Sequence, residues 1–309
     1  MYYLEELTQR DIAKSLHVSM ATVSRGLAKA KRDGIVEIRI HDDPEGFEDL
    51  EADLEDTYDL EECIIVPSSS RTENTLESMA RAVGELLERL LGSGEILGVS
   101  WGETLKAIAD SMPVTKNGHV DVIPIIGAMG EVETGIYPNA IAASFAVKLG
   151  GDGYLVNTPA ILDTTEMKRA MEQDGNFVRV QRVWEKVSTV LLGVSGLGSD
   201  DSVVKHGVLS EDELRRLRHS GIESAVNFTF LDSKAQVLHT EIDDRMIKME
   251  PDQLRSTANR VLVAAGAHKI KPIACALSAG MGSVLVTDYD TAARVRTEGC
   301  ADTQEVGER

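Results

Sequence analysis

Glycine-rich loops that carry hydroxyl side chains are the clearest chemical feature of the sequence. Three of them follow short aliphatic segments, at 98–104 (Gly-Val-Ser-Trp-Gly-Glu-Thr), 127–130 (Gly-Ala-Met-Gly) and 193–198 (Gly-Val-Ser-Gly-Leu-Gly). Backbone N–H groups of such loops bind anions at the start of a helix, and Ser100 and Thr104 add hydroxyl donors. Lys269, after a further aliphatic segment, would supply a cation. These residues together predict a site for a small phosphorylated ligand.

The same loops argue against nucleotide cofactors. None has the G-x-G-x-x-G spacing of a dinucleotide-binding fold, and the sequence contains no Walker A motif. NAD and ATP are therefore disfavoured, and we expect no cofactor. The three cysteines, Cys63, Cys275 and Cys300, are widely separated, which fits neither a disulfide framework nor a zinc site. We expect no metal site.

Residues 8–33 have the pattern of a helix-turn-helix. Thr8 and Ser19 are placed to cap two helices. Apolar pairs at i,i+4, Ile12 with Leu16 and Val23 with Leu27, would pack the helices together, with Val18 filling the angle between them. Gly34 would end the second helix, and 35–40 alternates like the strand of a wing. The outward face carries small and donor-bearing side chains that suit a major groove. The candidate DNA contacts are Thr8, Gln9, Ser19, Ala21, Thr22, Ser24, Arg25 and Lys29. A helical hairpin with no role in DNA binding is the alternative.

Charge changes sign after this segment. Residues 8–32 contain six basic side chains and one acidic side chain, whereas 41–62 contain twelve acidic side chains and no Lys or Arg. Pro44 and Gly46 predict a break in regular structure. We therefore expect a DNA-binding domain over 1–41, an acidic linker over 42–56 and an effector-binding and oligomerisation domain over 57–309. The net charge of −19 excludes a protein coated with positive charge but not a local nucleic-acid site.

The remaining sequence alternates short aliphatic runs with amphipathic segments. This order predicts βαβ units and a parallel sheet covered on both faces. Aromatic residues make up only 4% of the 309 residues, so the core must be aliphatic. The expected strands are 63–66, 96–100, 120–126, 153–156, 189–194, 225–228, 261–265 and 283–287. The expected helices are 76–91, 104–111, 140–149, 164–173, 211–219, 269–277 and 289–295.

Location is predicted from what the sequence lacks. It contains no 18-residue apolar run, so we expect no membrane-spanning helix and no membrane partner. Residues 1–6 lack the basic start and apolar run of a signal peptide. The sparse cysteines are typical of a reducing cytoplasm, so a cytoplasmic protein is expected.

Several segments, in this order, resemble the SorC family of bacterial sugar-responsive transcriptional regulators. They are "LTQRDIAKSLHVSMATVSRGLAKAKRDGIVEIRI", "GEILGVSWGETL", "LSEDELRRLRHSG", "IDDRMI" and "VLVAAGAHKIKPI" followed by "GSVLVTD". The resemblance implies an α/β protein with an N-terminal winged helix-turn-helix. This unit would be joined to a Rossmann-like parallel-sheet effector domain similar to sugar-phosphate isomerases and deaminases. It also implies a dimer or tetramer on double-stranded operator DNA, released or remodelled by a phosphorylated sugar.

Site residues follow from the same resemblance, motif by motif. Ser100, Trp101, Gly102 and Thr104 resemble the family's phosphate loop, and Gly127 and Gly130 resemble part of the ligand wall. Asp244 and Arg245 resemble polar contacts to the sugar, and Lys269 resembles a ligand-facing lysine. The chain departs from the pattern at Ile126, where some members that bind deoxyribose phosphate place a Schiff-base lysine, and at Asp243, where Asn is common. The first departure argues against covalent capture of the effector.

Three functions of different classes remain to be weighed. The first is a DNA-binding regulator, a repressor of a carbohydrate or polyol catabolic operon, whose operator binding is modulated by a phosphorylated sugar. The second is a sugar-phosphate isomerase or deaminase with a DNA-binding tail, and the third is a protein-interaction module. An enzyme needs a positioned acid and base, and no spacing singles out a pair among Asp121, Glu131, Asp200, His206 and Asp244. We therefore expect a regulator without catalytic residues.

Overall fold

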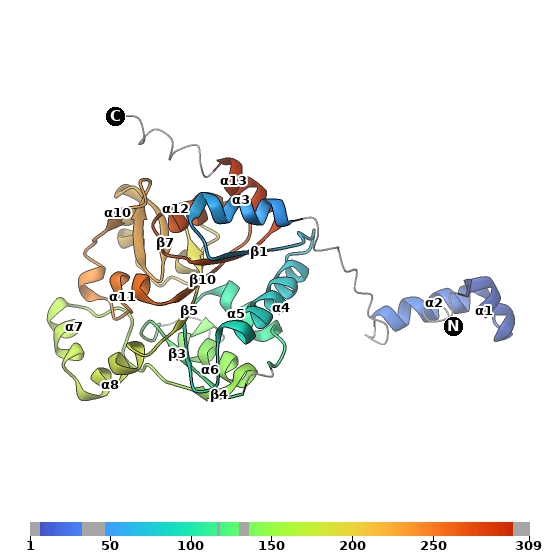
Figure 1. Cartoon of the computed structure of the whole chain (residues 1–309), viewed down its shortest axis with the longest axis horizontal. Helices are drawn as coiled ribbons and strands as arrows, with labels where there is room; N and C mark the ends of the chain where they lie inside the picture. Colours follow the sequence, from blue (N-terminus) through green and yellow to red (C-terminus); the bar gives the residue numbers. More distant parts are fainter. Residues whose placement is uncertain (1–6, 33–46, 116–117, 130–135, 299–309) are drawn as a thin grey trace. The chain divides into compact units, whose positions relative to one another are not determined.

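The computed structural model describes residues 7–32, 47–115, 118–129 and 136–298. Two compact units divide the chain, 1–44 and 45–309. Figure 1 labels elements of both units. Each unit is described by itself below.

The small unit is a pair of helices, α1 (Gln9–Ser15) and α2 (Met20–Arg32). Thr8 caps α1, because its Oγ1 accepts a hydrogen bond from the backbone N–H of Asp11 and donates one to Asp11 Oδ2 at 2.6 Å. The hydroxyl of Ser19 accepts from the N–H of Thr22 at 3.1 Å, as expected for the cap of α2. The two predicted caps are thus confirmed.

A small apolar core holds these two helices together. Ile12, Ala13 and Val23 are buried, and Leu7 and Leu27 pack against them. Leu16 and Val18, which the sequence pattern places inside, are instead exposed at 55% and 40%. The predicted helix end at Gly34 and the predicted wing over 35–40 lie outside the described residues.

The large unit is built on a parallel sheet, as predicted. Its seven strands run in the order β1-β11-β10-β5-β2-β3-β4, and every neighbouring pair is parallel. The strands are β1 (Glu62–Val66), β2 (Ile96–Val99), β3 (Val120–Pro124), β4 (Gly150–Gly153), β5 (Thr189–Leu192), β10 (Asn259–Val263) and β11 (Val284–Asp288). Aliphatic side chains alternate between the two faces: Val122 belongs to one apolar cluster and Ile123 to the other.

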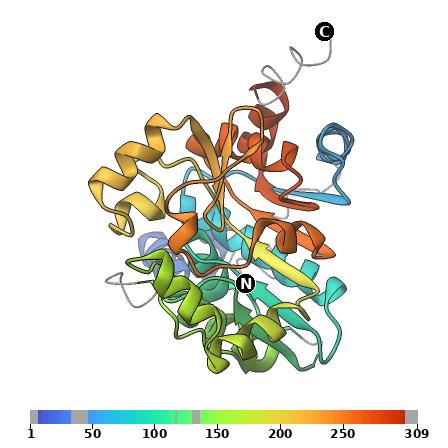
Figure 2. The ribbon, with the colours of Figure 1, turned by 90° about the vertical axis from the view of Figure 1, so that its left-hand side faces the viewer.

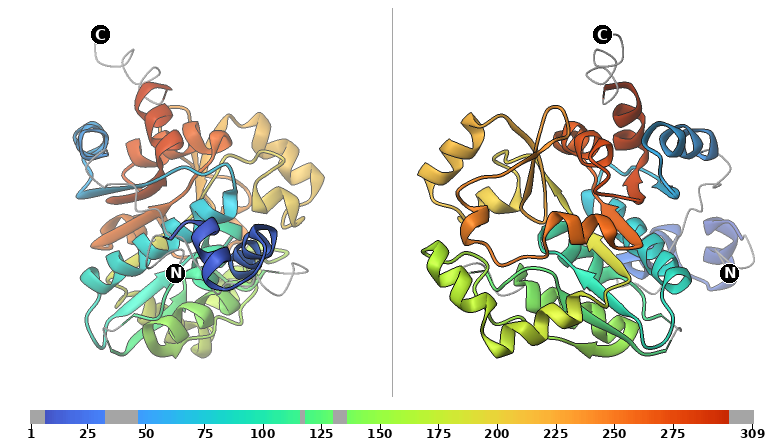
Figure 3. Two further views of the ribbon diagram at one scale, coloured as in Figure 1. Left: turned by 90° about the vertical axis from the view of Figure 1, so that its right-hand side faces the viewer. Right: turned by 60° about the vertical axis from the view of Figure 1, so that its left-hand side comes forward.

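Helices cover both faces of this sheet (Figure 2, Figure 3). One apolar cluster contains residues of α4 (Thr72–Leu90), α5 (Glu103–Ser111) and α6 (Pro138–Leu149). The other contains residues of α8 (Gly175–Trp184), α11 (Pro251–Ser256), α12 (Ile270–Ser278) and α13 (Tyr289–Glu298). The remaining helical segments are α7 (Thr165–Glu172), α9 (Ser202–Lys205), α10 (Glu211–His219), η3 (Asp243–Arg245) and η4 (Ala267–Lys269). Within the described part of the chain, every helix is too short or too polar to cross a lipid bilayer.

A second sheet was not predicted. It is antiparallel, in the order β6-β7-β8-β9, with β6 (Val194–Ser195), β7 (Ile222–Val226), β8 (Thr229–Asp232) and β9 (Val237–Leu238). The sequence analysis assigned 225–228 to one strand of the parallel sheet. Instead β7 ends at Val226, and Asn227 and Phe228 form the turn into β8, with φ angles of 47° and 56°.

The acidic stretch is not a linker throughout its predicted length of 42–56. Residues Glu48–Tyr58 form α3, whose Leu50 and Leu54 are buried in the large unit. Two of its carboxylates satisfy N–H groups of the edge strand β1: Glu51 accepts from Ile65 at 2.8 Å and Glu55 from Cys63 at 2.7 Å. Burial raises the pKa of Glu51. The prediction of a linker is therefore wrong from Glu48 onward, because Leu50 and Leu54 pack into the core and two carboxylates one helical turn apart accept hydrogen bonds from the sheet edge.

Candidate functional site

A pocket lies where β2 and β5 end and where Lys269 follows β10. We call it the carboxyl-end pocket, and the described residues that line it come from five segments. They are 100–105 after β2, 193–195 after β5, Ser202 and Val203 of α9, the residues Ala225, Asn227 and Phe228 around the end of β7, and Lys269. Ligands of open α/β sheets bind at this edge. The structure thus brings together the predicted residues Ser100, Trp101, Gly102, Thr104 and Lys269.

The loop between β2 and α5 presents the start of a helix to the pocket. Gly102 is the residue before α5 and has a φ of +122°, a conformation that side chains with a Cβ rarely adopt. The N–H groups of the first turn have no acceptor within their own helix. That of Glu103 donates to Ser202 Oγ at 3.2 Å. Thr104 and Leu105 follow in the same turn, which suits an anion.

An aromatic pair forms one wall of the pocket. The rings of Trp101 and Phe228 are stacked, with centroids 5.8 Å apart and planes inclined by 12°. Phe228 lies in the left-handed region, which is a strained conformation for a bulky residue. Its neighbour Asn227 is buried, accepts a hydrogen bond from Ser100 Oγ at 2.9 Å and donates to Ile125 O at 3.3 Å. The hairpin turn is therefore tied to the predicted phosphate loop by both of its residues.

A buried lysine forms a hydrogen bond to the backbone of this turn. Lys248 donates to the carbonyl oxygen of Phe228 and to Asp243 Oδ1, the latter at 2.7 Å. Its side chain is 1% exposed. Burial lowers the pKa of Lys248, and the negative charge of Asp243 opposes that change. Asp243 and Lys248 thus position the aromatic wall.

Lys269 is already paired in this structure. Its Nζ lies 2.8 Å from Asp201 Oδ1 and also donates to the carbonyl oxygen of Val194. The other oxygen of Asp201 accepts from the N–H groups of Gly196 and Gly198 at 3.1 and 2.8 Å. Burial acts to raise the pKa of Asp201, but Lys269 and the two N–H groups outweigh it, so the pKa is lowered. The third glycine-rich loop therefore wraps an internal carboxylate.

The family of the chain is settled by its match to a family model. The model for a putative sugar-binding domain matches residues 42–295. The chain belongs to this sugar-binding domain family.

Relatives and solved structures agree with this assignment. The deoxyribonucleoside regulator of Bacillus subtilis (strain 168) is 28% identical over 293 residues, which cover 94% of this chain and 93% of that protein. The sorbitol operon regulator of Klebsiella pneumoniae is 26% identical over 295 residues, 94% of each chain. The crystal structure of full-length SorC from Klebsiella pneumoniae matches with a TM-score of 0.80 at 26% identity and covers 96% of both chains. The predicted likeness to the SorC family and the predicted fold are confirmed.

Four predicted effector contacts of the sugar-binding domain are not among the described lining residues of the pocket. Gly127 is packed under 158–160, where a Cβ would lie 2.6 Å from the carbonyl oxygen of Thr158. Asp244 pairs with His239 at 3.0 Å, and Arg245 with Glu213 at 2.6 Å. Gly130 lies outside the described residues. Their roles stay predictions.

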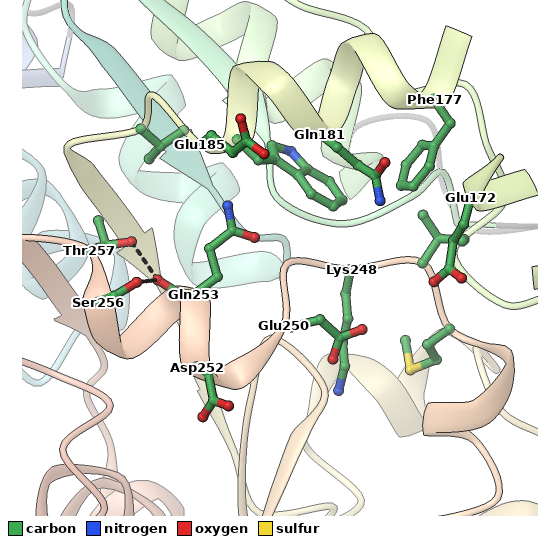
Figure 4. Close-up of a pocket in the computed structure, with 14 residues that line it drawn as sticks. Glu172, Phe177, Gln181, Glu185, Lys248, Glu250, Asp252, Gln253, Ser256 and Thr257 are labelled. Atoms are coloured by element: carbon green, nitrogen blue, oxygen red, sulfur yellow. Dashed lines mark hydrogen bonds between the residues drawn. The ribbon is translucent and has the colours of Figure 1, made fainter. Parts of the chain in front are cut away.

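A larger cavity of the sugar-binding domain lies elsewhere, between α8 and the segment 246–257 (Figure 4). Its volume is about 690 Å³, against about 50 Å³ for the carboxyl-end pocket. Its lining includes four carboxylates, those of Glu172, Glu185, Glu250 and Asp252. These charges would repel a phosphorylated ligand, so size alone does not identify the site. The free space of the carboxyl-end pocket is too small for a sugar phosphate unless its walls move.

The sequence-predicted DNA contacts lie outside the matched domain, in the small unit. Ser19, Ala21, Thr22, Ser24, Arg25 and Lys29 are all exposed on or beside α2. Arg25 Nε donates to Ala21 O at 3.2 Å within the helix. Thr8 is exposed and Gln9 half-buried at the start of α1. The hydroxyls of Thr8 and Ser19 already serve as helix caps.

Four of the five acid/base candidates weighed in the sequence analysis can be located, because Glu131 lies outside the described residues. His206 Nε2 lies 3.2 Å from Glu103, which also pairs with Lys205 at 3.1 Å. Burial acts to raise the pKa of Glu103, but hydrogen bonds from Lys205 and His206 outweigh it and lower the pKa. Among the described residues, Asp121, Asp200, His206 and Asp244 are not part of the pocket lining.

Proposed function

We propose that the protein is a DNA-binding transcriptional regulator whose operator affinity is set by a phosphorylated sugar bound in the carboxyl-end pocket. The observation that carries this proposal is the convergence of the Ser100–Thr104 loop, the start of α5 and Lys269 on one small cavity. The relatives named above are a deoxyribonucleoside regulator and a sorbitol operon regulator. By analogy, this protein represses a carbohydrate or polyol operon in the cytoplasm.

The phosphate would bind at the first turn of α5, where helix N–H groups and the hydroxyls of Ser100 and Thr104 converge. Lys269 would turn from Asp201 to the phosphate. The sugar would lie beside Trp101, whose ring stacks on Phe228. Because the free space is about 50 Å³, binding requires displacement of this wall. Movement of the Asn227–Phe228 turn would shift strands β7 and β8 of the antiparallel sheet, which this turn connects.

DNA binding would be performed by α2, with Arg25 and its exposed neighbours in a major groove. Two half-sites require paired recognition helices, so the protein would act as a dimer or tetramer. A ligand that binds one arrangement of effector domains more tightly shifts the population of that arrangement. The operator would thereby be released or held differently.

The decisive experiment joins the two halves of the proposal. Purified protein is titrated at fixed salt onto DNA from upstream of its own gene, with and without a panel of sugar phosphates. We expect tight specific binding that one member of the panel changes. Specific binding that no sugar phosphate alters would overturn the effector half, and turnover of a sugar phosphate above about 1 s⁻¹ would favour an enzyme.

Tryptophan fluorescence can locate the effector independently of DNA. The chain has two tryptophans, Trp101 in the pocket and Trp184 in the opposite apolar cluster. In a Trp184→Phe variant, Trp101 is the one remaining tryptophan, so the effector should change its emission. The dissociation constant from this change should equal the one obtained from the effect of the same sugar phosphate on DNA binding. In the Trp101→Phe variant, emission from Trp184 should not respond.

A further inference from the structure

A histidine and two aspartates converge at the far edge of the parallel sheet, where β4 is the last strand. His119 precedes β3, Asp121 lies within β3, and Asp152 lies within β4. His119 Nε2 lies 3.1 Å from Asp121 Oδ1 and 3.8 Å from Asp152 Oδ2. One ligand atom of each residue falls within 4.8 Å of the others. β3 and β4 run side by side in Figure 1.

The backbone fixes this arrangement. His119 and Asp121 are two residues apart, so they share one face of the strand. The pairing of β3 with β4 shifts register between Val120 and Val122, which places an extra residue in β4 opposite Asp121. Such a bulge re-aims a side chain. At Gly151 a Cβ would lie 1.9 Å from the carbonyl oxygen of Val120, so only glycine permits this approach.

Hydrogen bonds orient two of the three side chains. His119 Nδ1 lies 3.0 Å from the carbonyl oxygen of Gly150, which can only accept, so Nδ1 carries the proton. Nε2, on the other side of the ring, is directed at the two carboxylates. It donates a proton to them as an imidazolium, or it offers a lone pair when it carries no proton. Asp121 accepts from the N–H of Asp152 at 2.9 Å and from the hydroxyl of Tyr154 at 3.5 Å. A histidine whose second nitrogen donates to a carbonyl is the usual arrangement around a bound metal.

We propose that His119, Asp121 and Asp152 bind one divalent transition-metal ion, with Zn²⁺ the best match to one imidazole and two carboxylates. When Nε2 carries no proton, its lone pair and a carboxylate oxygen repel each other, and a cation between them removes the repulsion. Zn–N and Zn–O bonds of about 2.0–2.2 Å place tetrahedral ligand atoms roughly 3.3 Å apart. The side chain of Asp152 is 89% exposed, so it can close the remaining gap by rotation. Water would complete the coordination.

The ion would clip the edge strand β4 to β3. The site lies beside the amino end of β3, whereas the carboxyl-end pocket lies at the carboxyl ends of the strands. The sequence analysis expected no metal because it considered only the cysteines, whereas this site contains none, and its Asp152 is far from His119 in sequence. This assignment is independent of the proposed regulatory function.

The test is a metal titration of the full-length protein. Metal-free protein, dialysed against EDTA and then against buffer, is titrated with Zn²⁺ in competition with a chromophoric chelator. We expect one equivalent to bind with at least micromolar affinity, and His119→Gln and Asp152→Asn each to weaken it at least about tenfold. His239→Gln is the matched control, because His239 also lies 3.0 Å from an aspartate but belongs to no three-residue cluster in the described chain. It should bind Zn²⁺ like the wild type.

Two further readouts separate binding from folding. Zn²⁺ at a hundredfold excess over its dissociation constant should raise the Tm of the wild type by about 5 °C and leave that of His119→Gln unchanged. Metal-free His119→Gln and metal-free wild type should melt at similar temperatures. Two results would overturn the site: Zn²⁺ bound equally by wild type and His119→Gln, or no binding together with a ¹⁵N spectrum that shows Nε2 protonated. The second would identify a plain ion pair.

Discussion

Lys269, the side chain that we propose neutralises a ligand's phosphate, forms an ion pair with Asp201 in this structure. The carboxylate is 2% exposed and the lysine side chain 13%. The stability of each buried charge depends on its partner, because removal of one leaves the other desolvated and unpaired. The pair is therefore a structural element of the pocket as well as a candidate binding group.

A double-mutant cycle measures this dependence. Lys269→Met alone should lower the free energy of unfolding by about 3–5 kcal/mol, since it leaves a buried carboxylate unpaired. Lys269→Met with Asp201→Asn should cost clearly less than the two single changes added together. Urea unfolding provides the measurement. The exposed pair Lys106–Asp110 is the control, and its cycle should show coupling of at most about 0.5 kcal/mol.

Acid should weaken the wild type more than Asp201→Asn. The pKa of Asp201 is lower in the folded protein than its ordinary value near 4. A depressed carboxyl pKa contributes stability above about pH 4, and that stability is lost as the pH falls through the folded-state pKa. Urea midpoints between pH 6 and pH 3 should therefore fall more steeply for the wild type. Parallel curves for the two proteins would contradict the pKa assignment.

At the scale of the helix, α2 carries the prediction for DNA recognition. Arg25→Ala should weaken specific operator binding by about 1–3 kcal/mol if the guanidinium contacts a base. The helix itself should persist, because its cap at Ser19 and its buried Val23 are untouched. Arg215→Ala, an equal change of charge on the exposed face of α10, is the control and should bind operator like the wild type. Unchanged affinity for Arg25→Ala would remove Arg25 from the interface.

The regular elements could be predicted because their signals are local. Aliphatic runs located the parallel strands to within a few residues, and Thr8 and Ser19 carried a cap signal that the structure confirms. The antiparallel sheet gave no such signal, since β6 and β9 are two residues long. Phe228 was assigned to a strand because it is apolar, although it lies in a turn.

Part of the pocket could be predicted because it also has local signals in the sequence. Glycine-rich loops after strands are visible in sequence, and Ser100, Gly102 and Lys269 do converge. Asn227 and Phe228 were missed because their contact with the phosphate loop spans 127 residues between Ser100 and Asn227. Lys248 was missed because a lysine beside acidic residues suggests a solvated surface, whereas here it is enclosed. The acidic helix α3 was missed for the same reason, because its carboxylates suggested a solvated linker although Leu50 and Leu54 are buried.

For the whole molecule, the charge distribution predicts strongly salt-dependent DNA binding. The net charge is −19, while residues 8–32 carry a small positive excess. Phosphate contacts release counterions, so affinity falls as salt rises, and the remaining negative charge discourages non-specific binding. The logarithm of the binding constant should fall steeply with the logarithm of salt concentration. A slope near zero, measured by fluorescence anisotropy over a range of salt concentrations, would contradict this account.

The Asp201–Lys269 pair also determines how sensitive such a regulator would be. An internal carboxylate that occupies the binding cation acts as a tethered competitor at high effective concentration. A phosphate must displace it, so the observed affinity is weaker than the intrinsic affinity by the fraction of molecules in which Lys269 is unoccupied. The dose–response curve would accordingly lie at the concentrations of an abundant metabolite rather than a trace signal. Competition from Asp201 would keep the operon repressed until the sugar phosphate is plentiful.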